Sequence, residues 1–238
     1  MSLPPPLHAS MALFLDFDGT LAPIQDDPDS VALPIGGADK LERCSRYLEG
    51  AVAIISGRGL SDLAVRVPAT LWRLGGHGME VAAPGEALPE PQNTAPETLV
   101  IRLQDIVGDL PGVRLEPKGQ VIAVHYRAAP QAGAQLSEAI ETVLLDYPDY
   151  RLQSGKMVLE AKPSAADKGR ALAKTMQQSP FAGRIPVMIG DDTTDEAAMS
   201  AARSAGGFAI KVGVGPTVAQ YRLKDPEEVW AWLSQPST

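Results

Sequence analysis

Two aspartates separated by one residue, Asp16 and Asp18, come directly after an apolar run at 11–15. A run of this length predicts a buried strand, and side chains two positions apart in an extended segment share a face. Neighbouring carboxylates repel each other unless a cation or a shared proton relieves them. Open α/β sheets also bind ligands outside the carboxyl ends of their strands. The pair therefore indicates a site for a hard metal ion and an anionic substrate, although Asp-x-Asp-Gly also occurs simply as a turn.

Two further segments could bind an anion such as phosphate. Ser56, Gly57 and Arg58 follow the apolar strand predicted at 51–55, and a hydroxyl with backbone N–H groups at a helix start can bind an anion. Lys168 opens a predicted helix, and its ammonium could reach a phosphate as a point charge. Each feature also has an ordinary structural interpretation, because serine is a common helix N-cap and most lysines are solvated.

Four acids within six residues follow the apolar strand predicted at 186–189, namely Asp191, Asp192, Asp195 and Glu196. Clustered carboxylates are typical ligands of hard cations. Acids in the first turn of a helix are also favoured by the helix dipole. That second interpretation explains Asp195 and Glu196 better than it explains Asp191.

Predicted strands alternate with predicted helices along the chain, and the resulting fold must bring the candidate groups together. The alternation predicts an α/β fold with a parallel sheet, whose strand ends can converge on one crevice. The pattern changes between 86 and 163, where two amphipathic helices and two hairpins predict a small antiparallel sheet with helices on one face. We therefore expect a core formed by 1–85 and 164–238, with an α+β domain inserted at 86–163.

Composition narrows the classes of partner. The net charge of −8 among 238 residues argues against binding to nucleic acid, whose phosphates require a basic surface. The single cysteine, Cys44, excludes an internal disulfide and fits a reducing compartment, so we expect a cytoplasmic protein. We expect no signal peptide, because the N-terminus has no basic segment followed by an apolar stretch. We expect no membrane span, because no stretch has the required apolar length.

In combination, these motifs resemble those of the haloacid dehalogenase (HAD) superfamily of phosphohydrolases. The shared order is DxDGT at 16–20, Ser56 after a strand, then Lys168, then GDDTTDE at 190–196. Two shorter segments resemble the trehalose-6-phosphate phosphatase branch of that superfamily: His125-Tyr126-Arg127, and Gly155-Lys156 with Glu160. The resemblance covers nearly the whole chain and implies a Rossmann-like HAD core with an inserted cap domain.

The resemblance implies a phosphatase mechanism. Asp16 would attack phosphorus as the nucleophile and form an aspartyl phosphate. Asp18 would protonate the leaving sugar oxygen and then activate the hydrolytic water. The residues implied to bind the phosphoryl oxygens are Ser56, Gly57 and Lys168.

The resemblance also implies Mg²⁺ as the cofactor. Its ligands would be Asp16, the backbone carbonyl of Asp18 and Asp191, with Asp192 and Asp195 giving support from nearby. The ion would bring the nucleophile and the phosphate together and offset their repulsion.

The implied substrate is trehalose 6-phosphate, and the inserted domain would determine sugar specificity. The period of a strand places polar residues of this domain on shared faces: His125 with Arg127, Lys156 with Glu160, and Glu116 with Lys118. We expect these side chains to bind the sugar, with Arg58 and His77 of the core lining the junction. An open sheet face is also polar simply because it meets water, and His77 could equally serve a turn.

Three alternative functions stay open. A phosphatase of the same superfamily could act on sucrose, mannosylglycerate or glucosylglycerate phosphate, since only the inserted domain distinguishes these substrates. A phosphomutase also uses an Asp-x-Asp centre. A non-catalytic sugar-phosphate sensor is disfavoured, because it would not need the nucleophile Asp16. A trehalose-phosphate synthase is implied as a functional link, without physical contact.

Overall fold

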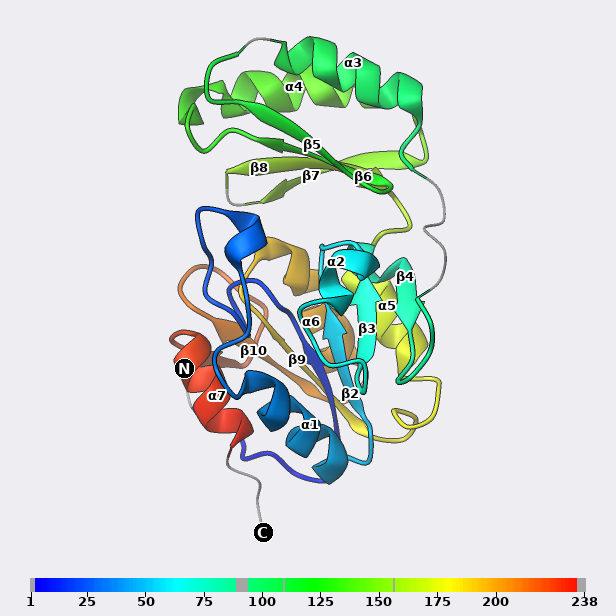
Figure 1. Ribbon diagram of the computed structural model, residues 1–238, viewed down its shortest axis with the longest axis vertical. Helices are drawn as coiled ribbons and strands as arrows, with labels where there is room; N and C mark the ends of the chain where they lie inside the picture. The colour runs from blue at the N-terminus through cyan, green and yellow to red at the C-terminus, as the bar shows by residue number, and fades with distance from the viewer. Residues whose placement is uncertain (1–2, 89–93, 109, 156, 235–238) are drawn as a thin grey trace. The chain divides into compact units, whose positions relative to one another are not determined.

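The computed structural model describes residues 3–88, 94–108, 110–155 and 157–234. The chain divides into two compact units (Figure 1). The core unit comprises Met1–Leu88 and Asp167–Thr238, and the inserted unit comprises Pro89–Ala166.

Within the described residues of the core unit, one seven-stranded sheet has the order β11-β10-β9-β1-β2-β3-β4. Every neighbouring pair is parallel except β3 and β4. The strands are β1 (Met11–Leu15), β2 (Val52–Ile55), β3 (Trp72–Gly75), β4 (Glu80–Ala82), β9 (Ile185–Gly190), β10 (Phe208–Val212) and β11 (Tyr221–Leu223). The central strands are buried on both faces, which is why their sequences are continuous apolar runs.

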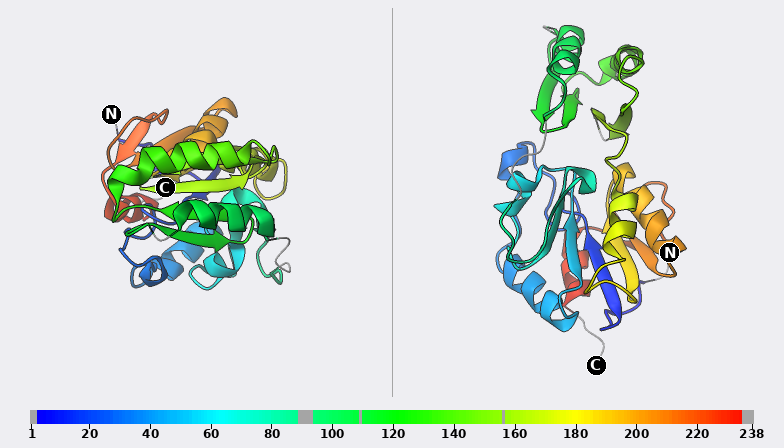
Figure 2. Two further views of the ribbon diagram at one scale, coloured as in Figure 1. Left: turned by 90° about the horizontal axis from the view of Figure 1, so that it is seen from above. Right: turned by 90° about the vertical axis from the view of Figure 1, so that its right-hand side faces the viewer.

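Helices cover both faces of this sheet. They are α1 (Gly37–Tyr47), α2 (Leu60–Ala64), α5 (Lys168–Thr175), α6 (Glu196–Ser204) and α7 (Pro226–Leu233). α1 and α7 lie on one side, and α5 and α6 lie on the other (Figures 1 and 2). Phe181, which follows α5, contacts the rings of Phe14 in β1 and Trp72 in β3. The indole N–H of Trp230 donates to the Leu21 carbonyl at 2.9 Å, which joins α7 to the chain after β1.

The described residues of the inserted unit form an antiparallel sheet of order β5-β6-β8-β7 and two α-helices. Its elements are α3 (Glu97–Val107), β5 (Arg114–Lys118), β6 (Val121–His125), α4 (Gly133–Leu144), β7 (Tyr150–Gly155) and β8 (Val158–Pro163). Ile122 and Val124 of β6 and Leu159 of β8 share a buried cluster with Leu103 of α3 and Ile140 of α4. The helices therefore cover the apolar face of this sheet. The predicted class, a parallel α/β core with an inserted α+β segment, is confirmed.

Several boundaries differ from the sequence prediction. The patterns do not predict β4 and β11, which are three residues each and too short to show a period. The sequence pattern over 60–67 is typical of a helix, but α2 ends at Ala64. The pattern over 120–127 is typical of a strand, but β6 ends at His125, because the chain turns there and the Ala129 N–H donates to the Tyr126 carbonyl. Among the described residues, no helix combines the length and apolar character that crossing a bilayer requires.

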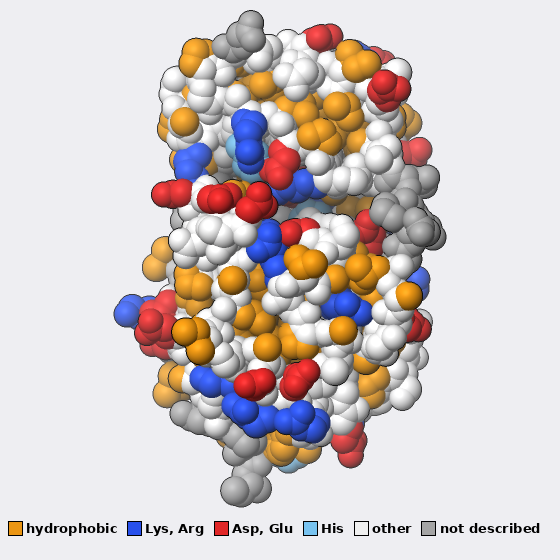
Figure 3. Space-filling view, viewed as in Figure 1, with side chains coloured by type: hydrophobic (Ala, Val, Ile, Leu, Met, Phe, Trp, Pro, Cys, Tyr) orange, Lys and Arg blue, Asp and Glu red, His pale blue; other side chains and the backbone are white. Residues whose placement is uncertain are grey.

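α1 illustrates how spacing determines the buried side of a helix. Leu41 and Cys44 are buried together with Leu48, which follows the helix. The exposed side carries charges of both signs, and Figure 3 shows them at the lower end of the core unit, where α1 lies in Figure 1. This 3–4 spacing is the amphipathic pattern that the sheet-facing side of a surface helix requires.

We predict that Cys44 stays unmodified in the folded protein. Burial raises the pKa of its thiol from 9.0 to about 12, so the reactive thiolate is scarce near neutral pH. Ellman's reagent should label the native protein at least about a hundredfold more slowly than the urea-unfolded protein, because labelling requires local opening. Rapid labelling of the native protein would contradict this packing of α1.

Candidate active site

Three side chains that could take part in catalysis follow adjacent strands of the core sheet. Asp16 follows β1, Ser56 follows β2 and Asp191 follows β9. β1 lies between the other two strands and is parallel to both, so these three residues leave the same edge of the sheet. The chain proceeds from β1 through β2 and β3 on one side, and through β9, β10 and β11 on the other. Such a reversal of strand order is where open α/β sheets place ligands.

Lys168 joins two buried carboxylates at this edge. Its Nζ donates to Asp16 Oδ1 at 2.7 Å and to Asp195 Oδ1 at 2.6 Å. Asp167 caps α5 by accepting from the N–H groups of Gly169 and Arg170, and this cap makes Lys168 the first residue of the helix. Burial alone would lower the pKa of Lys168, but the two carboxylates raise it above its ordinary value, so the side chain is a permanent cation.

Asp195 is held by the backbone as well as by Lys168. Its Oδ2 accepts from the N–H groups of Asp191 at 3.0 Å and Asp192 at 3.1 Å. A Cβ on Gly190 would lie 2.4 Å from Asp195 Cγ, so a glycine at the end of β9 is what lets this carboxylate approach. Asp195 therefore orients the loop that carries Asp191 and completes the environment of Lys168.

The carboxylates at this edge fit a hard cation. Asp16, Asp191 and Asp195 each offer an oxygen, and these oxygens lie within 4.8 Å of one another. Burial, followed by the charges of Asp195 and Asp192, raises the pKa of Asp191 to about 7. In the described part of the chain, the Asp191 carboxylate accepts no hydrogen bond. Carboxylate oxygens are the ligands that Mg²⁺ prefers, and a divalent cation would supply the positive charge that this cluster lacks.

The loop after β2 has the features of an anion site. Ser56 is buried, and its Oγ accepts from the Arg58 N–H at 3.1 Å. The ring of His77 packs against Gly57, where a Cβ would lie 2.9 Å from His77 Cε1. His77 has a φ of 57° between Gly76 and Gly78, and it is 2% exposed. The structure thus places His77 beneath the predicted phosphate loop.

Arg58 lies beside Asp18. Its Nε donates to Asp18 Oδ2 at 2.8 Å, and its Nη2 donates to Asp18 Oδ1 at 2.6 Å. Its Nη1 donates to Asp62 at 2.7 Å. Sequence reasoning missed this pairing of two predicted site residues, because they are 40 positions apart.

Sequence reasoning also missed Lys211. This lysine lies in β10, is buried, and donates to the backbone carbonyl of Asp191. The signal for it was present, because a lysine inside the apolar run of β10 must find a partner to be buried.

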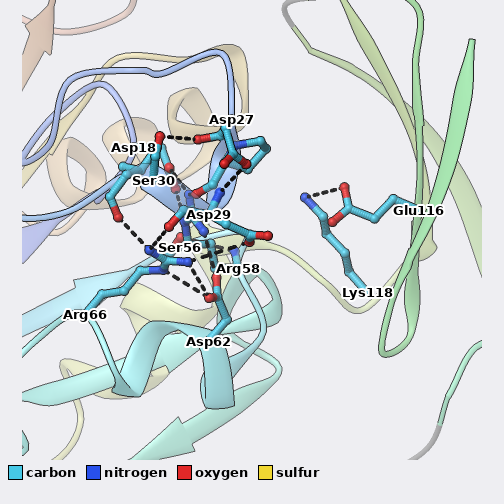
Figure 4. Close-up of polar contacts among 12 residues, drawn as sticks. Asp18, Asp27, Asp29, Ser30, Ser56, Arg58, Asp62, Arg66, Glu116 and Lys118 are labelled. Carbon is cyan, nitrogen blue, oxygen red and sulfur yellow. Dashed lines mark hydrogen bonds and ion pairs between the residues drawn. The ribbon is translucent and has the colours of Figure 1, made fainter.

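Predicted sugar-binding residues of the inserted unit form a cluster of their own. His125 Nε2 donates to Glu116 Oε2 at 2.8 Å, and Lys118 Nζ lies 3.3 Å from the same oxygen (Figure 4 shows the Glu116–Lys118 pair). Burial alone would raise the pKa of Glu116, but Lys118 and His125 lower it below its usual value. His125 shares β6 with Ile122 and Val124, whose side chains meet the helices, so the cluster lies on the opposite face of the sheet.

The other predicted sugar-binding residues are distributed differently. Glu160 of β8 pairs in register with Ala123 of β6, on the same face as His125. Arg127 lies beyond the end of β6 and is exposed, so the period of the strand does not place it. Lys156 lies outside the described residues.

Comparison with known proteins shows the family. The family model described as trehalose-phosphatase matches residues 14–227. The chain belongs to the trehalose-phosphatase family. It is 37% identical over 238 residues to the trehalose-6-phosphate phosphatase of Escherichia coli, covering 98% of this chain and 89% of that protein. It is 41% identical over 206 residues to a probable trehalose-phosphate phosphatase of Sinorhizobium fredii, covering 85% and 77%.

The fold is likewise found among solved structures of this family. The C-terminal domain of the Candida albicans trehalose-6-phosphate phosphatase matches with a TM-score of 0.82 at 22% identity, covering 96% of this chain and 91% of that one. At this identity the match shows the fold alone. The resemblance to the trehalose-6-phosphate phosphatase branch, drawn from the motifs, is confirmed by the family match and by the named relatives.

We predict that replacing Lys168 with methionine destabilises the core unit. The change removes the cation between two buried carboxylates, so the free energy of unfolding in EDTA should fall by about 3–5 kcal/mol. Added Mg²⁺ should restore part of that loss, because a divalent cation supplies the missing positive charge. The measurement is urea unfolding with and without Mg²⁺. Lys224→Met, at a lysine side chain that is 80% exposed, is the control. Equal unfolding free energies for the two variants would contradict a stabilising role of Lys168.

Proposed function

We propose that this phosphoric monoester hydrolase of the trehalose-phosphatase family converts trehalose 6-phosphate into trehalose and phosphate, with Mg²⁺ and through an aspartyl phosphate on Asp16. The observation that carries the proposal is the position of Asp16. Its carboxylate is held by buried Lys168 at the edge where Ser56 and Asp191 also emerge. The names of the relatives support trehalose 6-phosphate as the substrate.

Asp16 is the nucleophile of this mechanism. Lys168 donates to Oδ1 alone, and this bond fixes the carboxylate while leaving Oδ2 without a donor from Lys168. Attack by a carboxylate oxygen on phosphorus forms the acyl phosphate as the sugar oxygen departs. The hydroxyl of Ser56, the backbone N–H groups beside Gly57 and the ammonium of Lys168 stabilise the charge on the phosphoryl oxygens.

The residues that would hold Mg²⁺ are Asp16, Asp191 and the backbone carbonyl of Asp18, with Asp192 and Asp195 supporting them. When bound, the ion offsets the repulsion between the carboxylates and the phosphate. Asp195 serves indirectly, since both of its oxygens already accept hydrogen bonds.

Asp18 is the general acid and base. It donates a proton to the departing sugar oxygen and then takes one from the water that hydrolyses the acyl phosphate. Asp18 follows the nucleophile by two residues, just after β1, and in this proposal both carboxylates act on one reacting phosphate.

The inserted unit supplies sugar recognition in this proposal. A disaccharide presents many hydroxyls, and the Glu116–Lys118–His125 cluster offers both donors and acceptors on one sheet face. Glu160, on the same face as His125, belongs to this proposed sugar site, and the sequence pattern adds Arg127 and Lys156 as candidates. The substrate itself comes from a trehalose-phosphate synthase, with which no contact is implied.

The test is phosphate release, with Mg²⁺ and with EDTA, from trehalose 6-phosphate, sucrose 6-phosphate, glucose 6-phosphate and mannosylglycerate phosphate. We expect release that depends on the metal and is fastest from trehalose 6-phosphate. Asp16→Asn should bind trehalose 6-phosphate and release no phosphate, because the nucleophile is lost.

Each alternative has its own outcome in this panel. Faster release from another sugar would retain the mechanism and reject the assigned substrate. Migration of phosphate on the sugar would indicate a phosphomutase. Binding by the unaltered protein without release would indicate a sensor, and wild-type turnover by Asp16→Asn would contradict the nucleophile.

A further inference from the structure

We propose that Arg58 is a positioning residue for Asp18, and that α2 and the segment 28–31 hold Arg58 in place for this task. The inference rests on the proposed function, because it assigns Asp18 the roles of general acid and base. It gives Arg58 a different role from the sugar contact that the sequence predicts.

The contact between Arg58 and Asp18 has two points. Each oxygen of the Asp18 carboxylate accepts from a different nitrogen of the guanidinium, at 2.8 and 2.6 Å. A two-point contact between planar groups fixes the orientation of the carboxylate, which a single hydrogen bond does not. Both half-reactions need this carboxylate at the same phosphorus, so its orientation is what the chemistry requires.

The remaining donors of Arg58 are directed within the core unit. Nη1 donates to Asp62 at 2.7 Å, and Nη2 also donates to the Pro28 carbonyl at 2.9 Å. The guanidinium carbon lies 5.6 Å from the centre of the Phe17 ring. The Arg58 side chain is 10% exposed, against 37% for Asp18. Arg58 is thus enclosed on several sides, whereas Asp18 stays accessible to a reacting group.

Asp62 and Arg66 extend this support to the chain that follows Asp18. Arg66 Nε donates to Asp62 at 3.0 Å, and its Nη1 donates to the carbonyls of Val31 at 2.5 Å and Asp29 at 3.2 Å. Asp62 lies in α2 and Arg66 one turn later, so both face the segment 28–31 (Figure 4). We call Asp18, Arg58, Asp62 and Arg66 the Asp18 support network.

A substrate without a sugar distinguishes whether Arg58 positions Asp18 or binds the sugar. We would measure turnover of p-nitrophenyl phosphate and the fraction of acid-quenched phosphoenzyme at steady state, for the unaltered protein and for Arg58→Ala. Hydrolysis of the acyl phosphate needs Asp18 as a base whatever the leaving group was. We therefore expect kcat to fall about tenfold or more, with phosphoenzyme at or above the unaltered level.

Two further variants sharpen the test. Arg58→Lys should retain the loss, because an ammonium cannot bond both carboxylate oxygens in a fixed plane. Asp62→Asn should give a smaller loss of the same kind, because it loosens Arg58 without touching Asp18. Arg43→Ala, at an exposed arginine of α1, is the control and should match the unaltered protein.

Three results would overturn the inference. Unchanged turnover of p-nitrophenyl phosphate, with a raised KM for trehalose 6-phosphate, would make Arg58 a sugar contact. A parallel fall of kcat and phosphoenzyme would indicate a distorted nucleophile site. Full activity of Arg58→Lys would show that charge alone suffices. Failure of the proposed function is distinguishable, because the unaltered protein would then form no phosphoenzyme.

Discussion

The buried contact of Lys168 with Asp16 and Asp195 is the interaction on which the rest of the site depends. Two carboxylates and one ammonium are removed from water at the edge of the core sheet, and each is costly to bury unless the others are present. The cluster keeps a net negative charge, to which Asp191 adds. That excess explains why the same residues both fix a nucleophile and fit a divalent cation.

The fold brings these charges together by the ends of its elements. Asp16 and Asp191 follow neighbouring strands, and Lys168 begins the helix that returns from the inserted unit. Gly19 lets the backbone after Asp18 pass close to Asp191, since a Cβ at position 19 would lie 2.1 Å from Asp191 Oδ2. Rigid strands on both sides hold the nucleophile, while Asp18, one step further along, depends on side chains of α2 for its orientation.

Sequence reasoning predicted the strand ends and their acids because both follow local rules. Apolar runs mark β1, β2 and β9, and the residue after each run is a candidate group. The pairing of Arg58 with Asp18 follows no period and depends on how loops meet in the folded chain, so it was not predictable. A local pattern can also mislead. The alternation predicts that Arg127 shares a strand face with His125, but a turn ends β6 before Arg127.

Trapping the acyl phosphate would identify the nucleophile. The protein would be mixed with trehalose 6-phosphate and Mg²⁺, quenched in acid within one turnover, reduced with borohydride and digested for mass spectrometry. Reduction of an aspartyl phosphate yields homoserine, and we expect homoserine at position 16 only. Phosphate release without modification at Asp16, or homoserine at Asp18, would contradict the assignment of Asp16 as the nucleophile.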